Sequence, residues 1–358
     1  MNDRGISRRS LLVAVAGGLA LGAAWRQAAA AEAGPLISFI INVHDWRNPD
    51  ESADTLLRLV ELFSRHGVRG DFYLTPTMAD LYAARRPEVV AALGTMTISH
   101  HVRPPHPLNS GFGAPLAGLS GPALEAALRD YQTYRLDLAT GGLDRSAPGG
   151  FTFMTDLFGR PPTVVGSPSD NPTIRPVAKR LYREFGGRAI VRYHEEGTAI
   201  DRPFEYDAGL LVRPSDFSVT RWSNARVKEQ FWWNMLTGLH AADFVPLAYL
   251  QRRLAGWNAS RPPIITALIH ENNLVRQGPE SFTLCYFADR DKNVPLSPPF
   301  DLNAPDLSRR RSAGEQAAIW AAYEEMVAWS AANLTVVTSE DLVAMAVGER
   351  VWQFSPIG

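Results

Sequence analysis

The feature that most constrains the fold is an alternation of strand and helix patterns. The run Leu36–Val43 (LISFIINV) is apolar and β-branched and lacks a regular polar/apolar alternation, which is typical of a strand covered on both faces. A helix is predicted next, because apolar residues recur at helical spacing between Leu56 and Phe63, and Ser52 or Asp54 is placed to cap it.

The alternation continues through another strand, helix and strand. Gly70–Thr75 (GDFYLT) is predicted to be a strand, and Pro87 suits the first turn of a helix that ends at Gly94. Thr95–Ser99 is predicted to be the third strand. This β-α-β-α-β order predicts an α/β fold with a parallel sheet or barrel.

The rest of the chain extends the pattern. Further strands are predicted at 163–165, 188–191, 209–212, 263–269 and 334–337, and helices at 122–138, 225–239, 244–254, 313–332 and 339–346. No internal repeat or low-complexity block divides these elements. We therefore expect residues 34–358 to form a single domain of the (β/α) barrel type.

Residues 1–33 have the layout of an export signal. Arg8 and Arg9 precede an apolar run from Leu11 to Ala24, and the small-residue tract ending at Ala33 offers a cleavage site. The apolar run is shorter than the about 20 residues of a membrane span, so we expect no stable span in the mature protein. The paired arginines resemble a twin-arginine signal, which implies the twin-arginine export machinery as a partner and a periplasmic or secreted location.

Charge and cysteine content exclude two further classes of protein. The 358 residues carry a formal net charge of −1, which argues against a nucleic-acid partner that is bound through a basic field. The single cysteine, Cys285, cannot form an internal disulfide, so a disulfide-stabilised scaffold is excluded.

Chemistry-bearing side chains gather where three predicted strands end. They are His44 and Asp45 after the first strand, His100, His101 and His106 after the third, and His270 and Glu271 after the late strand at 263–269. Because functional groups in parallel α/β folds collect at the carboxyl ends of the strands, we expect these residues to lie at one face of the barrel.

Histidines and a carboxylate from different strands are typical of an open divalent-metal site. A metal bound there lowers the pKa of its water toward 7 and polarises a carbonyl group, and a further histidine can protonate the leaving group. The candidate ligands are Asp45 and at least two of His100, His101 and His106.

The same residues resemble the polysaccharide deacetylase (NodB-homology) family. The resemblance is carried by Asn42–Asp45 (NVHD), Gly70–Leu74 (GDFYL), the histidine-rich string His100–His106, and Leu268–His270 (LIH). It implies a distorted or incomplete barrel of seven to eight strands and a divalent metal, Zn²⁺ in the first place and Co²⁺ or Mn²⁺ as alternatives. It also implies that Asp45 binds the metal and that His270 is the acid.

The sequence departs from the family pattern at the base, at the histidine pair and at an arginine. His44 stands where the family has the aspartate that acts as base, so His44 is the candidate base, with Glu271 as a group that could share that duty. His106 lies five or six residues after the other two histidines rather than four. The family's arginine-containing third motif is not evident, and Arg103 or Arg276 is the candidate for its positive charge.

These observations predict an exported, metal-dependent hydrolase that removes an acyl group, such as acetyl, from a carbohydrate or a related amide or ester. In this interpretation His44, His270 and Glu271 are the candidate catalytic residues. Two alternatives stay open. One is a carbohydrate-binding relative without catalysis, and the other is a glycosidase on the same barrel, which needs two positioned carboxylates.

Overall fold

The structure is a computed structural model. It describes residues 35–109, 111–166, 169, 171–192, 204–214, 232–236, 245–256, 264–277 and 283–353. The export signal predicted at residues 1–33 lies outside the described residues.

The main sheet is built from strands that alternate with helices along the chain. The strands are β1 (Leu36–Val43), β2 (Asp71–Leu74), β3 (Thr97–His101), β6 (Val164–Gly166), β7 (Ala189–Arg192), β8 (Tyr206–Asp207), β9 (Leu210–Pro214), β10 (Trp232–Leu236), β11 (Ile264–His270) and β14 (Thr335–Val336). The helices are α2 (Pro49–Arg65), α3 (Pro76–Arg85), α4 (Pro87–Leu93), α5 (Gly121–Tyr131), α6 (Gly150–Phe158), α7 (Arg175–Glu184), α8 (Pro246–Ala255), α9 (Thr283–Tyr286), α10 (Ala313–Asn333) and α11 (Ser339–Gln353). Two small antiparallel strand pairs lie outside the main sheet, namely β4 (Tyr134–Leu136) with β5 (Leu143–Pro148) and β12 (Arg276–Gln277) with β13 (Arg309–Arg310). The short 3₁₀ helices η1 (Ala114–Leu116) and η3 (Glu271–Leu274) also lie outside it.

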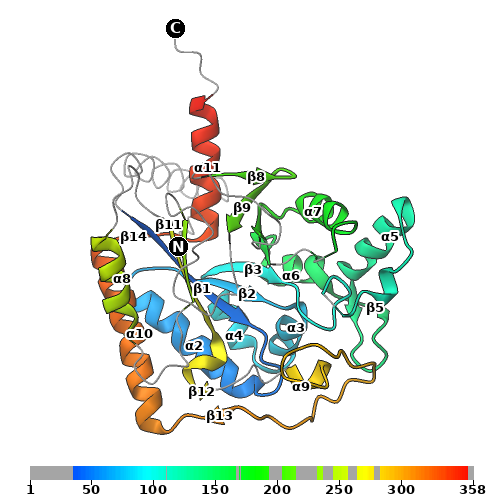
Figure 1. The fold of residues 1–358 in the computed structure, drawn as a ribbon, viewed down its shortest axis with the longest axis horizontal. Helices are drawn as coiled ribbons and strands as arrows, with labels where there is room; N and C mark the ends of the chain where they lie inside the picture. Colours follow the sequence, from blue (N-terminus) through cyan, green and yellow to red (C-terminus); the bar gives the residue numbers. More distant parts are fainter. Residues whose placement is uncertain are drawn as a thin grey trace, which may run out of the picture.

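The main sheet is curled and open, with β10 and β8 at the two ends of its strand order. The sheet runs β10-β11-β1-β2-β3-β6-β7-β9-β8, so the late strand β11 returns to pair with β1. Every pairing along this path is parallel except that of β8 with β9. Among the described strands no pairing joins β9 with β10. The predicted α/β class is therefore confirmed, with a curled half-barrel of eight parallel strands (Figure 1).

Side chains on the main strands alternate between the helices and the interior of the curled sheet. On β1, Ile37, Phe39 and Ile41 pack in a cluster with α2 and α10 residues such as Phe63 and Tyr323, whereas the even-numbered positions face inward. Ring contacts support this packing, because Phe39 lies 5.7 Å from Phe63 and 6.3 Å from Tyr323 between ring centroids. Burial of large apolar side chains on this face supplies much of the driving force for folding. Figure 1 shows α2, α8 and α10 along this side of the sheet.

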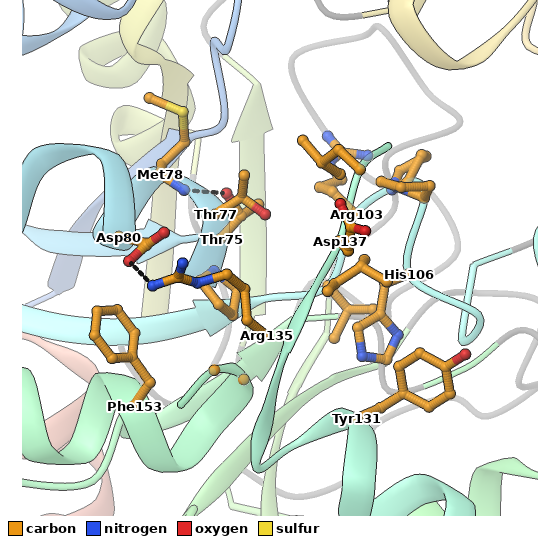
Figure 2. A pocket seen from close by; sticks show the side chains of 18 of the residues that line it. Thr75, Thr77, Met78, Asp80, Arg103, His106, Tyr131, Arg135, Asp137 and Phe153 are labelled. Carbon is orange, nitrogen blue, oxygen red and sulfur yellow. Dashed lines mark hydrogen bonds and ion pairs between the residues drawn. The ribbon is translucent and has the colours of Figure 1, made fainter. Parts of the chain in front are cut away.

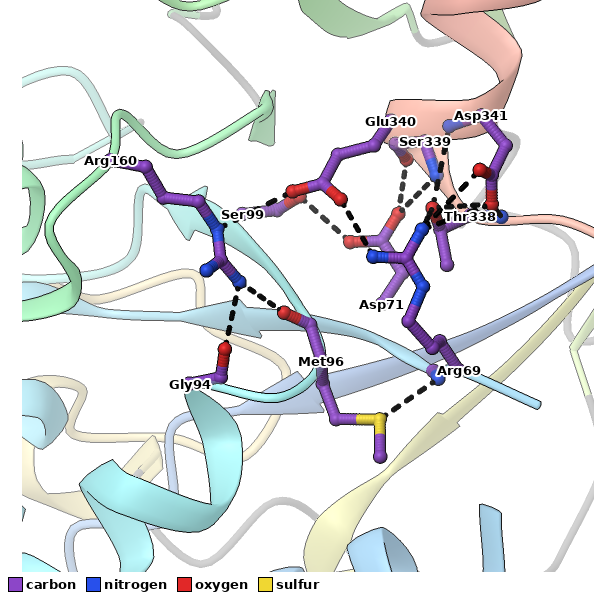
Figure 3. Close-up of polar contacts among 11 residues, drawn as sticks. Arg69, Asp71, Gly94, Met96, Ser99, Arg160, Thr338, Ser339, Glu340 and Asp341 are labelled. Carbon is purple, nitrogen blue, oxygen red and sulfur yellow. Dashed lines mark hydrogen bonds and ion pairs between the residues drawn. The ribbon is translucent and has the colours of Figure 1, made fainter. Parts of the chain in front are cut away.

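A buried ion pair crosses the interior and joins strands that are not neighbours. Arg213 on β9 lies 3.1 Å from the Asp71 carboxylate on β2 and also contacts Thr266 on β11. Asp71 further accepts hydrogen bonds from Ser99 on β3 and from Ser339 at the start of α11 (Figure 3). Since β9 lies near one end of the strand order and β2 in its middle, these contacts join distant parts of the sheet across its interior.

The structure differs from the predicted elements in three places. The strand predicted at 95–99 lies at Thr97–His101, so His100 and His101 belong to the strand rather than following it. The helix predicted at 122–138 ends at Tyr131, because residues 134–136 pair with β5 in an antiparallel hairpin. Within the helix predicted at 225–239, Trp232–Leu236 is a strand that pairs with β11, and its apolar run satisfies either pattern.

The first helix also begins earlier than predicted. It starts at Pro49 after the N-cap Asn48, so Ser52 and Asp54 lie inside it and do not cap it. In the part of the chain that the structure describes, no helix has the length and apolar character needed to cross a membrane.

Candidate active site

Three of the predicted histidines face inward at the carboxyl ends of their strands. His44 follows β1, and His101 and His270 end β3 and β11. Side chains that are two residues apart in a strand point to the same face. The residues two positions before these histidines are Asn42, Ser99 and Leu268, which also point to the interior of the curled sheet. The His44 ring lies 5.6 Å from the His101 ring and 5.0 Å from the His270 ring between centroids. The structure therefore brings these three imidazoles together from three strands.

A cation joins this histidine group. The Arg103 Nη2 atom lies 3.3 Å from His44 Nε2. Because a guanidinium group only donates hydrogen bonds, His44 Nε2 must carry a lone pair to accept this one. His44 is therefore held as a neutral imidazole whose ring proton is on Nδ1.

His270 is held from the neighbouring strand and from the turn that follows it. The Asn42 side-chain nitrogen lies 3.4 Å from His270 Nε2, and the His270 backbone N–H donates to Asn273 Oδ1 at 3.2 Å. Asn42 and His270 are register partners in the parallel pair of β1 and β11. These contacts fix the ring at the end of its strand.

His101 occupies a space that a glycine leaves open. A β-carbon placed on Gly166 of β6 would lie 2.9 Å from His101 Nδ1 and 3.5 Å from the Tyr73 ring. The Tyr73 ring also meets the His101 ring edge to face at 6.2 Å between centroids. Gly166 therefore permits the inward placement of His101, and a larger residue would displace the ring.

His100 lies on the opposite face of β3. Its ring packs 5.6 Å from Phe151 of α6 and 5.5 Å from Tyr182 of α7, between centroids. Burial lowers the pKa of His100 to about 3, with a smaller contribution from His106, so the ring is neutral. Within the described residues neither ring nitrogen has a hydrogen-bond partner. The alternation of side chains along a strand thus separates His100 from His101.

His106 lies in the loop after β3, and both of its ring nitrogens are engaged. The Leu108 backbone N–H donates to Nδ1 at 3.2 Å, and Nε2 lies 3.1 Å from the side-chain amide of Gln132. Burial lowers the pKa of His106 to about 3, so the ring is neutral and carries its proton on Nε2. The Gln132 amide must then present its oxygen to that proton.

Glu271 and Asp45 organise the turn that carries His44. Glu271 Oε1 accepts hydrogen bonds from the backbone N–H groups of His44 at 2.9 Å and Asp45 at 2.6 Å. Burial, together with the nearby Asp45 charge, raises the pKa of Glu271 to about 8. The Asp45 carboxylate itself accepts from the Arg47 backbone and from the Asn48 side chain. Both acids therefore stabilise the loop after β1.

A cavity of about 540 Å³ opens onto the histidine group. His44, His101, Arg103 and His106 line one part of it, and the β4–β5 hairpin lines another. Figure 2 shows Arg103 and His106 on one side of the cavity and the pair of Arg135 with Asp80 on the other. Five aromatic side chains also line the cavity, namely Trp46, Tyr131, Tyr134, Phe153 and Tyr286.

The residues predicted to hold a metal ion do not form one donor set. His100 is on the far face of β3, and the ring nitrogens of His106 and the carboxylate oxygens of Asp45 are hydrogen-bonded to other groups. Among the residues that the structure describes, no group of three or more His, Cys, Asp or Glu side chains is placed to hold a metal ion. A guanidinium beside His44 also disfavours a second cation there. Within the described part of the chain, the predicted ligands Asp45, His100, His101 and His106 are therefore not brought together as one set of metal donors.

Sequence reasoning missed most of the cavity wall. Gln132, Gly166 and the aromatic residues of the cavity were not singled out, because their partners are distant in the sequence. Trp46 had the clearest signal, since it directly follows Asn42–Asp45. Arg276, the second arginine considered for the positive charge, pairs instead with Glu51 at 2.7 Å and Asp306 at 3.0 Å.

Comparison with known proteins gives no family assignment. No family model matches the sequence, and no curated protein matches it. A crystal structure from Mycobacterium smegmatis, described provisionally as a polysaccharide deacetylase, is similar with a TM-score of 0.45 and 12% identity, over 89% of this chain and 92% of that one. A 4-α-glucanotransferase from Thermococcus litoralis has a TM-score of 0.46 and 12% identity, over 87% of this chain and 40% of that one.

Proposed function

We propose that this protein is a hydrolase that removes an acyl group, such as acetyl, from a carbohydrate. The observation that carries the proposal is the meeting of His44, His101 and His270 at the carboxyl ends of β1, β3 and β11, in contact with Arg103. In parallel α/β folds this is the end of the sheet where reactions take place. All four residues lie in the sequence segments that resemble the polysaccharide deacetylases.

The imidazoles supply acid and base at the end of the sheet. A neutral imidazole accepts a proton from water as the water attacks the acyl carbon, and a protonated one returns a proton to the leaving nitrogen or oxygen. His44 is the base candidate from the sequence, and the hydrogen bond that its Nε2 accepts from Arg103 must break before Nε2 takes a proton from water. His270 is the acid implied by the family resemblance. Such proton transfers contribute about 10²- to 10⁴-fold to a rate.

Glu271 has a positioning role in this proposal. Its carboxyl oxygen holds two consecutive backbone N–H groups, those of His44 and Asp45, and it is fully buried. A group without access to the cavity does not touch the substrate. Glu271 instead fixes the direction in which the His44 ring leaves β1.

The shape and lining of the cavity favour a sugar. Aromatic side chains stack on the apolar faces of pyranose rings, and polar groups between them hydrogen-bond to hydroxyl groups. Trp46 and Tyr286 line the cavity together with His44. Ligand cavities commonly enclose about 300–1,000 Å³, and this one lies in that range.

Acetate release tests the proposal. The purified protein is incubated with acetylated mono- and oligosaccharides, and acetate and reducing ends are both measured. Acetate release that depends on His101 supports the proposal. Release of reducing ends without acetate indicates a glycosidase and contradicts it.

A non-catalytic carbohydrate-binding protein is the second candidate. The separation of Asp45, His100 and His106 into different environments favours this alternative, because these residues do not form one metal-binding set among the residues that the structure describes. Binding of an acetylated oligosaccharide that is unchanged by His270→Ala, without acetate release from any substrate, supports the second candidate over the first.

The export route also belongs to the proposal. Twin-arginine export predicts that the mature protein lacks residues 1–33 and is found in the periplasm or the medium. N-terminal sequencing of the protein from the native cell distinguishes this from retention of the intact N-terminus.

A further inference from the structure

A second polar group lines the cavity away from the histidine group. Asp80 of α3 and Arg135 of β4 both line it, and Arg135 Nη2 lies 3.2 Å from Asp80 Oδ1. Figure 2 shows this pair on the other side of the cavity from Arg103 and His106. The cavity therefore has polar side chains at two places, and the proposed reaction uses those at only one of them.

The pair is carried by two elements whose backbones are closely held. Helix α3 starts directly after β2, and Thr75 caps it by accepting a hydrogen bond from the Met78 backbone N–H at 3.3 Å. On the hairpin, a β-carbon on Gly149 would clash with the backbone of Tyr134 and Arg135, so β5 ends in direct contact with β4. The positions from which the two charged side chains reach the cavity are therefore well defined.

An aromatic side chain adds an apolar surface at the same part of the cavity. Phe153 of α6 lines the cavity and is partly buried against the main core cluster. Helix α6 packs against both α3 and β4, the elements that carry Asp80 and Arg135. Figure 2 shows the Phe153 ring on the side of the cavity where this pair lies. An aromatic ring offers an apolar face on which the apolar face of a sugar ring can stack.

A carboxylate beside a guanidinium matches two neighbouring hydroxyl groups of a sugar. Each hydroxyl group both donates and accepts hydrogen bonds, whereas an ionised carboxylate only accepts and a guanidinium only donates. The side chains of Asp80 and Arg135 are 39% and 46% exposed, so a ligand in the cavity can reach them. An ion pair this exposed contributes little to stability, and it can therefore exchange part of its contact for a ligand at little cost.

We propose that Asp80, Arg135 and Phe153 form a subsite for a second sugar ring, next to the ring whose acyl group lies at the histidine group. This inference rests on the proposed function and narrows its substrate class to an acylated saccharide of two or more rings, rather than a monosaccharide. The second ring is remote from the reacting bond. Its binding therefore supplies free energy that holds the acyl group in position.

Binding of saccharides of increasing length tests the subsite without any catalytic activity. Calorimetry on the full chain compares N-acetylglucosamine with its β-1,4-linked dimer and trimer. The dimer is expected to bind about tenfold more tightly than the monomer in the original protein, since it adds hydrogen bonds to charged groups and a stacked ring. Asp80→Asn and Arg135→Gln should each weaken dimer binding about tenfold and weaken monomer binding less.

Asp54→Asn is the matched control, because the Asp54 carboxylate also forms an exposed ion pair, with Arg86 at 2.8 Å, but does not line the cavity. This variant is expected to bind each saccharide as the original protein does. Equal affinities for monomer and dimer in the original protein overturn the inference. Equal weakening of monomer and dimer in Asp80→Asn also overturns it, because Asp80 would then shape the whole cavity rather than a subsite for one ring. Folding of each variant is checked by its circular dichroism spectrum.

Acetate release separates failure of the inference from failure of the proposed function. The kcat/KM for acetate release is expected to be about tenfold higher for the dimer than for the monomer, and Asp80→Asn should bring this ratio close to one. Acetate release that is equally efficient from monomer and dimer overturns the inference and leaves the hydrolase proposal intact. Length-dependent binding that is lost in Asp80→Asn, without acetate release from any acetylated saccharide, supports the sugar subsite and contradicts the hydrolase proposal.

Discussion

Replacing Glu271 by glutamine is expected to remove a pH dependence of stability. The Glu271 carboxyl group is fully buried, and its pKa is raised from an ordinary value near 4.5 to about 8 by burial and by the Asp45 charge. Between these two pH values the unfolded chain binds fewer protons than the folded protein. The free energy of unfolding therefore falls as the pH rises from about 4.5 to about 8, and no further above that.

The size of the effect follows from the shift. One pKa unit corresponds to about 1.4 kcal/mol, so the full window gives an upper limit of about 4 to 5 kcal/mol. In Glu271→Gln the amide oxygen still accepts the backbone N–H groups of His44 and Asp45. The variant should therefore keep the fold but lack the proton equilibrium.

Urea unfolding followed by tryptophan fluorescence at pH 5, 6, 7 and 8 measures the difference. The original protein should lose stability relative to Glu271→Gln at each step, by about 1 kcal/mol per pH unit. Parallel curves for the two proteins across this range would refute the assignment of Glu271 as a buried group that is neutral in the folded state.

Three further predictions concern residues whose environments the structure sets apart. His101→Ala is expected to lower acetate release in steady-state assays by about 10²- to 10⁴-fold. His100→Leu, on the opposite face of β3, should leave the rate within a few-fold of the original. Equal losses in the two variants would contradict the placement of His101 and His100 on opposite faces of β3. Gly166→Ala should lower kcat about tenfold while the melting temperature changes little, because the new β-carbon would lie 2.9 Å from His101 Nδ1 and displace the ring. An unchanged kcat would show that the position of the His101 ring is not needed for the reaction. Arg213→Met leaves the Asp71 carboxylate buried without its cation and should lower the free energy of unfolding, measured with denaturant, by about 3 to 5 kcal/mol. A decrease below about 1 kcal/mol would refute the stabilising role of this ion pair.

The sequence predicted the first half of the fold well because its signals are local. The strand at Leu36–Val43 has the predicted bounds, and the helix that begins at Pro87 ends next to Gly94. The β4–β5 hairpin was missed because residues 134–136 continue a helical pattern, and the partner segment at 143–148 carries no apolar strand pattern of its own. A local pattern does not contain that information.

The sequence predicted which strand ends carry the histidines. Which of these histidines face the interior depends on where β3 begins and ends. A shift of two residues in β3 moved His100 and His101 into the strand, where alternation sends them to opposite faces. If the predicted strand had been extended to His101, alternation along it would have placed His100 and His101 on opposite faces, so that one of them could face His44 and the other could not. The contact between Arg103 and His44 spans 59 residues, and the engagement of His106 by Gln132 spans 26, so neither is visible in the sequence.

The most direct test of the account is a crystal structure with an acetylated oligosaccharide bound to an inactive variant such as His270→Ala. The account predicts that the sugar occupies the cavity along the aromatic residues. The acetyl carbon should lie within about 3.5 Å of the position for an attacking water beside His44 and His101. A sugar bound outside this cavity, or an acetyl group directed away from the three inward histidines, would contradict it.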